Sequence, residues 1–245
     1  MKRIRTTLCT IALISGICAL QSCINDGHDY ELQRPTALVT VRPSEDGSSF
    51  SLQLDNATTL YPSNVKASPY GKKEVRALIN YTEEKDFDKS GQVHINWMDS
   101  IRTKAPVPYL GEDNDTKYGN DPIEIVRDWV TVAEDGYLTL RIRTVWGNIG
   151  RIHYINLLTG SNPEDPFELE LRHDARNDTY GELGDALIAF NLNDLPHDGK
   201  DNVKLKLKWK SFSGPKSAEF DLHMHQEASH LTGVPDNMMH SRQVQ

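Results

Sequence analysis

The segment Val203-Lys-Leu-Lys-Leu-Lys-Trp-Lys210 carries an apolar side chain at every second position and a lysine at each position between. Successive side chains of a β-strand point to opposite faces of the sheet, so this alternation predicts a strand with one buried and one solvated face. The next segment, 217–224, alternates in the same way. The two segments therefore predict a pair of neighbouring strands.

The charges on these segments suggest a register for the pair. If residues 211–217 join the strands, Lys208 lies opposite Glu219 and Lys206 lies opposite Asp221. Opposite charges on paired strands stabilise a sheet slightly. The lysine row is therefore interpreted as a structural feature of a sheet.

The same period of two runs through the chain from residue 36 onward, and no stretch of twelve residues shows the helical period. This predicts an all-β protein in which helices are single turns at most. A first domain, 36–104, is expected to be a small barrel or sandwich with strands that include 50–54, 75–81 and 93–97. A second domain, 123–226, is expected to be a sandwich with strands at 129–132, 137–145, 151–157, 166–172, 186–191, 203–210 and 217–224.

Residues 105–122 separate the two domains in this interpretation. They are rich in proline, glycine and acidic residues and show no periodicity, which predicts a linker. The last residues, 227–245, are polar and also lack a period, and we expect them to form a disordered tail.

The amino terminus has the pattern of an export signal. A basic start is followed by a short apolar run, Ile11–Leu20, that has too few residues to span a membrane. Leu20-Gln-Ser-Cys23 resembles a bacterial lipobox, in which the cysteine is lipidated and the leader, here 1–22, is removed. Several acyl chains on one residue would anchor the protein permanently.

The segment after the predicted cleavage site, 23–35, is polar and is expected to be a lipidated tether. Ile24 rather than an aspartate follows Cys23, which by resemblance to sorting signals favours the outer membrane. The sequence leaves open whether the protein faces the periplasm or the cell surface.

Composition excludes two classes of protein. The chain has 27 basic and 35 acidic residues, a net charge of −8, and removal of the leader leaves 24 against 35, a net charge of −11. Such an acidic protein is not expected to bind nucleic acid, because phosphate recognition depends on positive charge. A mean hydropathy of −0.55 argues against a protein with several membrane spans.

The strongest candidate for a ligand or interaction site is a cluster of acidic, basic and polar residues at a predicted strand end: Arg172, His173, Asp174, Arg176 and Asn177. Loops carry function more often than cores do, but turn hydrogen bonds would also explain these residues. The sequence contains no GxSxG motif, and no cysteine other than Cys23 remains after cleavage. We therefore expect no catalytic residues and no enzymatic activity.

No metal or cofactor is expected. Asp221, His223 and His225 alternate along one predicted strand and His230 follows, but no HExxH motif is present and Asp221 has a lysine partner in the register above. The acidic run 112–115 lacks the spacing of a calcium loop.

Two further features concern carbohydrate. Barrels of the oligonucleotide/oligosaccharide-binding (OB) type can bind oligosaccharides on one face, and Tyr70, Tyr81, Trp97 and Tyr109 are candidates for an aromatic platform. Asp99-Ser100-Ile101 resembles a short bacterial O-glycosylation acceptor motif.

Several blocks of sequence together resemble the NigD-like lipoproteins of Gram-negative gut anaerobes: Ile95–Ile101, Gly119–Ile123, Asp128–Val130, His153–Leu157, Leu169–Asp178 and Ala189–Leu192. The resemblance implies an OB-like barrel followed by an immunoglobulin-like β-sandwich behind a lipid anchor. It implies no catalytic residues. We expect a non-enzymatic envelope lipoprotein whose two β-modules present an interaction surface to an unidentified protein or glycan partner, with a link to bacteriocins suggested by the family name, and the alternative is a glycan-binding lipoprotein.

Overall fold

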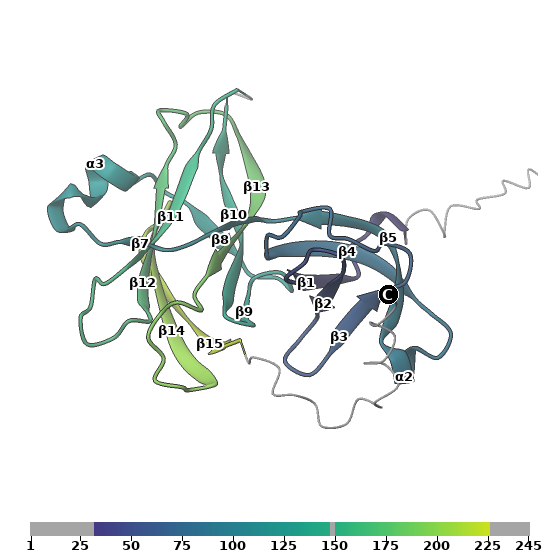
Figure 1. The fold of residues 1–245 in the computed structure, drawn as a ribbon. Helices are drawn as coiled ribbons and strands as arrows, with labels where there is room; N and C mark the ends of the chain where they lie inside the picture. Colours follow the sequence, from purple (N-terminus) through teal and green to yellow (C-terminus); the bar gives the residue numbers. More distant parts are fainter. Residues whose placement is uncertain (1–31, 148–149, 226–245) are drawn as a thin grey trace, which may run out of the picture.

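The computed structural model describes residues 32–147 and 150–225, which form two β-domains joined in sequence order (Figure 1). The first domain is a closed barrel with strand order β1-β2-β3-β5-β4. Its elements are β1 (Ala37–Pro43), β2 (Phe50–Gln53), β3 (Thr59–Pro62), β4 (Val75–Glu83), α2 (Phe87–Ser90) and β5 (Gln92–Ser100). The barrel has the OB architecture that the sequence predicts.

The barrel core follows directly from the alternation in its strands. Leu52, Leu60 and Val93 face inward from three strands and have no exposed surface. Each such aliphatic side chain contributes about 1.5–3 kcal/mol by leaving water. The intervening polar residues of β2 and β5 lie on the outer face.

The second domain is a β-sandwich. One sheet has the order β6-β13-β10-β8, with β9 also paired to β10, and the other has the order β15-β14-β12-β11-β7. The first sheet contains β6 (Arg102–Lys104), β8 (Glu124–Val126), β9 (Val132–Glu134), β10 (Tyr137–Trp146) and β13 (Glu182–Asn191). The second contains β7 (Val107–Pro108), β11 (Tyr154–Thr159), β12 (Glu168–Asp174), β14 (Asn202–Ser211) and β15 (Gly214–His223). The two sheets enclose one apolar core.

Residues 105–122 do not form the unstructured linker that their composition predicts. They contain β7, a 3-10 turn at Gly111–Asp113 and the short helix α3 (Asn114–Tyr118). β7 pairs with β11, and immediately before it β6 pairs with β13. Tyr118 is buried, and its hydroxyl donates a hydrogen bond to the carbonyl of Pro108. The chain therefore enters the sandwich directly after the barrel.

The pairing of β14 with β15 is confirmed, but the predicted register is wrong by two residues. Lys206 lies opposite Glu219, and Lys204 lies opposite Asp221. The prediction assigned seven residues to the connection, whereas β14 continues to Ser211 and β15 begins at Gly214, whose positive φ of 107° closes a tight turn.

The lysine row pairs with acids on two neighbouring strands. Lys206 and Lys208 both contact the carboxylate of Glu168 on β12, and their hydrogen bonds lower the pKa of Glu168. Lys204 pairs with Asp221 on β15. The structural interpretation of the row is thus confirmed, although the partners differ.

A buried polar network joins the two domains. Arg76 of β4 has no exposed surface, donates to Thr40 at 2.9 Å, and forms an ion pair with Glu134 of β9. Thr40 donates to Asp135 at 2.5 Å, and Arg42 donates to the same carboxylate at 2.5 Å. Burial alone would raise the pKa of Asp135, but hydrogen bonds and the charge of Arg42 outweigh it and lower the pKa. Barrel and sandwich are therefore held as one body.

Within the described ranges no helix is long and apolar enough to cross a bilayer. The predicted leader, Cys23 and most of the tether lie outside these ranges, as do the tail residues 227–245.

Candidate functional site at the end of the sandwich

The predicted cluster 172–177 lies where β12 ends, at the end of the sandwich that is remote from the barrel (Figure 1). The chain reverses in the turn Ala175–Asp178, in which the amide of Asp178 donates to the carbonyl of Ala175 at 2.9 Å. Arg176 and Asn177 occupy its centre with φ values of 54° and 65°. Positive φ at both central positions is the geometry of a type I′ turn.

A chain of buried hydrogen bonds runs beneath this turn. His173 Nδ1 lies 3.1 Å from the carbonyl oxygen of Pro122, and His173 Nε2 lies 2.9 Å from Nδ1 of His153. His153 Nε2 then lies 3.2 Å from an Oδ atom of Asp178. The ring of Trp146 stacks on His153 with 4.1 Å between centroids. Both imidazoles have only 1% of their surface exposed, so they act inside the domain.

The partners determine where the protons of this chain reside. A carbonyl oxygen can only accept, so His173 carries a proton on Nδ1, and burial lowers its pKa so that the ring stays neutral. His173 Nε2 must then accept from His153 Nδ1. His153 Nε2 completes the chain through its contact with the Asp178 carboxyl.

This arrangement connects segments that are distant in sequence. It links Pro122, the end of β10, the residues before β11, and the turn after β12. None of its side chains is a hydroxyl or a thiol. Its physical effect is to fix the loops at this end of the sandwich.

The start of β11 with the residues before it, and the segment after β12, expose apolar and basic side chains beside the chain of hydrogen bonds. Ile152, Tyr154 and Tyr180 are 68%, 45% and 86% exposed. The guanidinium of Arg176 lies 5.6 Å from the centroid of the Tyr154 ring, and Arg151 donates to the carbonyl of Arg176 at 2.6 Å. These five residues, Arg151, Ile152, Tyr154, Arg176 and Tyr180, are called the end surface below.

The other predicted residues of the cluster have structural partners. Arg172 pairs with Asp115 of α3 at 2.5 Å and with Glu170, and its hydrogen bond lowers the pKa of Asp115. Asp174 accepts the amide of Arg176 at 2.8 Å. The structure therefore places Arg176 on the end surface, whereas His173 is buried beneath it and Arg172 and Asp174 support the fold.

Sequence reasoning missed the roles of His153 and Trp146 in the site; it placed Asp178 in the polar cluster but did not predict its contact with His153. A signal was present for His173, because Leu169, Leu171 and His173 occupy successive inward positions of β12. A histidine that continues an apolar alternation is buried and needs hydrogen-bond partners. The partners themselves come from other strands, which the sequence does not pair.

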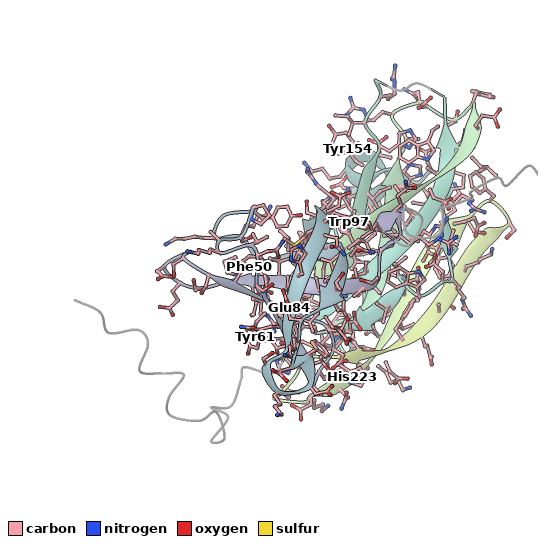
Figure 2. The ribbon with its side chains drawn as sticks, turned by 90° about the vertical axis from the view of Figure 1, so that its right-hand side faces the viewer. Phe50, Tyr61, Glu84, Trp97, Tyr154 and His223 are labelled. Atoms are coloured by element: carbon pink, nitrogen blue, oxygen red, sulfur yellow. The ribbon has the colours of Figure 1, made fainter. Side chains whose placement is uncertain are left out.

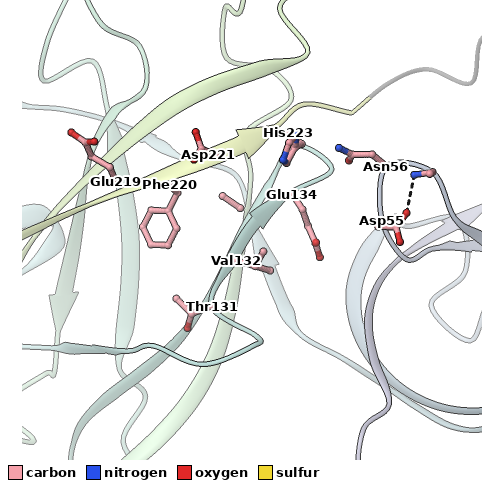
Figure 3. Close-up of a pocket in the computed structure, with 11 residues that line it drawn as sticks. Asp55, Asn56, Thr131, Val132, Glu134, Glu219, Phe220, Asp221 and His223 are labelled. Carbon is pink, nitrogen blue, oxygen red and sulfur yellow. Dashed lines mark hydrogen bonds between the residues drawn. The ribbon is translucent and has the colours of Figure 1, made fainter.

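A hollow of about 630 Å³ lies between the domains (Figure 3). Asp55 and Asn56 of the barrel face Glu134, Asp221 and His223 of the sandwich across it. Two of the carboxylates have cationic partners, since Glu134 pairs with Arg76 and Asp221 with Lys204.

The histidines near this hollow do not assemble a metal site. His225 contacts Asp135 at 3.0 Å and Arg42 at 2.5 Å rather than His223. In the part of the chain that the structure describes, no group of three His, Cys, Asp or Glu residues could hold a metal ion. His230 lies outside that part.

The four aromatic residues suggested as a glycan platform are not brought together. Tyr70 and Tyr81 pack against the barrel core, Trp97 donates to the carbonyl of Leu32 at 2.5 Å, and Tyr109 lies in the sandwich domain. A different aromatic residue, Tyr61, is 49% exposed and lines a groove of about 590 Å³ on the barrel. Figure 2 shows Tyr61 and Tyr154 at opposite ends of the molecule. Ser100, of the glycosylation-like motif, is exposed on β5.

The fold and its end surface define a two-domain β-protein with an OB barrel fused to a β-sandwich. Residues 38–101 match the model of the NigD-like N-terminal OB domain, and residues 105–222 match that of the NigD-like C-terminal beta sandwich domain. The chain belongs to the NigD-like family. The second match begins at residue 105, so the predicted linker is part of it.

Solved structures share this fold. A protein from Parabacteroides distasonis described as toxin-related is 30% identical, with a TM-score of 0.65 over 76% of this chain and 92% of its own. A Bacteroides vulgatus protein of unknown function is 22% identical, with a TM-score of 0.60 over 76% and 89%. A NigD-like immunity protein from Bacteroides caccae is 23% identical, with a TM-score of 0.54 over 75% and 90%. No protein of curated function matches the chain.

Proposed function

We propose that this protein is a non-enzymatic lipoprotein of the outer membrane, anchored through Cys23, that binds a partner protein through the end surface of its sandwich. The observation that carries the binding role is the group of three large apolar side chains at the start of β11 and in the loops beside it, each 45–86% exposed, beside two arginines. Tyrosine and arginine are enriched among residues that dominate protein–protein affinity.

The polar groups of the site favour binding over catalysis. His153, His173 and Asp178 satisfy one another in the interior, and Arg172 is engaged by Asp115 and Glu170. A general base must reach a substrate proton, and these groups are turned toward the protein. The same groups hold the loops in place, which reduces the entropy lost on binding a partner.

The descriptions of related proteins suggest which class of partner this protein binds. A relative that is 30% identical is described as toxin-related, and a more distant one as an immunity protein. A partner of the bacteriocin class would meet a lipoprotein at the envelope. The immunity or toxin-related role is part of the proposal for this chain.

Two experiments test the proposal. Radiolabelled palmitate should label the wild-type protein and fail to label Cys23→Ala, and persistent labelling would show that the anchor is elsewhere. Photo-cross-linkers placed at Ile152 and Tyr180 in intact cells should capture a defined protein, while one at Lys85, an exposed residue of the barrel, should not. Absence of any specific adduct at the two end-surface positions would refute the binding role.

The Tyr61 groove supports a second candidate, the binding of glycans. Besides the exposed ring, it is lined by Ser49, Ser51 and Ser63, whose hydroxyl groups suit sugar hydroxyls. Titration of the protein with oligosaccharides should then give heat that Tyr61→Ala abolishes. No heat at millimolar sugar would eliminate this candidate.

A further inference from the structure

The backbone conformation at Arg176 is one that glycine adopts more easily than arginine. Its φ of 54° lies in the left-handed region, which strains an ordinary L-residue and which glycine adopts freely. The turn itself therefore does not require arginine at this position. Strained residues of this kind persist where the side chain serves another purpose.

The guanidinium groups of Arg176 and Arg151 are exposed, and neither forms an ion pair with any described residue. Two carboxylates beside the turn accept backbone amides, because Asp174 accepts the amide of Arg176 and Asp121 accepts the amide of Ala175, each at 2.8 Å. In a chain of net charge −8, two unpaired arginines side by side form a local basic site.

The surroundings of these arginines are apolar. Ile152 adjoins Arg151, and Tyr154 lies beneath Arg176. A guanidinium that stacks on an aromatic ring keeps its edge free for bidentate hydrogen bonds to a carboxylate. The surface thus combines apolar area with two donors matched to carboxylates.

The position of the end surface favours a protein partner over the membrane of the anchor. Tyr137, at the start of β10, contacts Glu74 of the barrel, and Trp146, at the end of the same strand, lies beneath the end surface. Nine residues of strand separate them by about 30 Å. Residue 32, the first described residue of the predicted tether, accepts a hydrogen bond from Trp97, so this part of the tether lies on the barrel.

On the basis of the proposed function, we infer that the end surface recognises a protein segment that carries carboxylates among apolar side chains, with Arg176 as its central contact. The segment lies on Tyr154 and Ile152, and its carboxylates accept hydrogen bonds from Arg176 and Arg151.

The central variant is Arg176→Gly, which relieves backbone strain and removes the guanidinium. The lipidated full chain in detergent is presented to a displayed library of random short peptides, and the selected peptides are titrated onto each variant. We expect the selected sequences to be enriched in Asp and Glu between apolar residues. Arg176→Gly should weaken their binding about tenfold or more while its unfolding midpoint stays the same or rises.

Two matched controls separate the effect of removing an arginine charge from the effect of relieving backbone strain. Asp198→Gly relieves a positive φ of 51° in a different loop, and Arg127→Ala removes an exposed arginine outside the end surface. Both should bind the peptides as the wild type does. Peptides without carboxylate enrichment, or equal binding by Arg176→Gly, would overturn the inference.

Two further measurements give the alternative outcomes. Binding to phosphatidylglycerol vesicles that is lost in Arg176→Gly would replace the protein partner with a lipid surface and overturn the inference. If cross-linkers at Ile152 and Tyr180 capture a protein equally well in wild type and Arg176→Gly, the proposed function stands and this inference fails. If they capture nothing, the proposed function itself fails.

Discussion

Arg76 of the barrel and Glu134 of the sandwich form an ion pair across the domain boundary, and the Arg76 side chain is completely excluded from solvent. A buried guanidinium is tolerated only when its donors are satisfied. Here Thr40 and Thr139, one from each domain, accept the remaining hydrogen bonds. The pairing of the two domains is thus a condition for burying this charge.

Replacement of Arg76 by leucine should destabilise the protein by about 3 kcal/mol, because Glu134 and two threonines lose their partner at the interface. Urea unfolding measures this loss. Arg143→Leu, which breaks an exposed pair with Asp185, is the control and should have little effect. Equal effects of the two variants would contradict the role of burial.

Acidification should destabilise the end of the sandwich through His173. Burial lowers the pKa of this residue in the folded state below the ordinary value of 6.5. The unfolded chain therefore binds the proton first, and the stability that His173 contributes above pH 6.5 is lost as the pH falls below it. As the pH decreases over this range, the unfolding free energy of His173→Gln should fall less steeply than that of the wild type. NMR titration would contradict the assignment if the His173 ring protonated above pH 6.5.

Asp135 should make a contribution of the same sign, but at lower pH. Its folded pKa is lowered, so the stability it provides is present above the ordinary value of 3.8 and is lost as the pH falls through the lower folded value. Asp135→Asn should be less stable than the wild type at pH 7 because Arg42 and His225 lose a charged partner. The two proteins should converge in stability in acid, as measured by chemical unfolding at each pH.

Gly119 should not tolerate a side chain. Its φ is +77°, and a Cβ atom would lie 2.5 Å from the carbonyl oxygen of His173 and 2.6 Å from Cα of Asp174. Gly119→Ala should cost about 2 kcal/mol or more, through both backbone strain and the clash. Gly160→Ala is the matched control, since Gly160 has a φ of +86° with nothing within 4 Å, and it should cost only the strain. Thermal unfolding of the two variants measures the difference in stability between them.

The sequence predicted the fold class well because alternation is a local property. Leu205, Leu207 and Trp209 are buried at alternate positions of β14, and the same rule predicted strands β4, β5, β10 and β12. It failed at 105–122, where the short strand β7 and the burial of Tyr118 depend on contacts with distant segments. It also failed in the β14–β15 register, where a glycine turn replaced the expected longer loop.

The candidate site was predicted only in part for the same reason. The residues 172–177 stood out by composition, and Arg176 does lie on the end surface. His153 and Asp178 gain their roles only because β11 and β12 pair, which brings His153 to within 2.9 Å of His173. The spacing of His153 and His173 along the chain does not indicate that they lie close together in the fold.

The length of β10 has a mechanical consequence. It reaches from the barrel to the loops beneath Arg176, and it is paired with β13 through ten successive residues from Tyr137 to Trp146. If, as proposed, the protein is anchored through Cys23 and binds a partner at the end surface, tension between the two would act along β10, and its ten residue pairs with β13 would share the load.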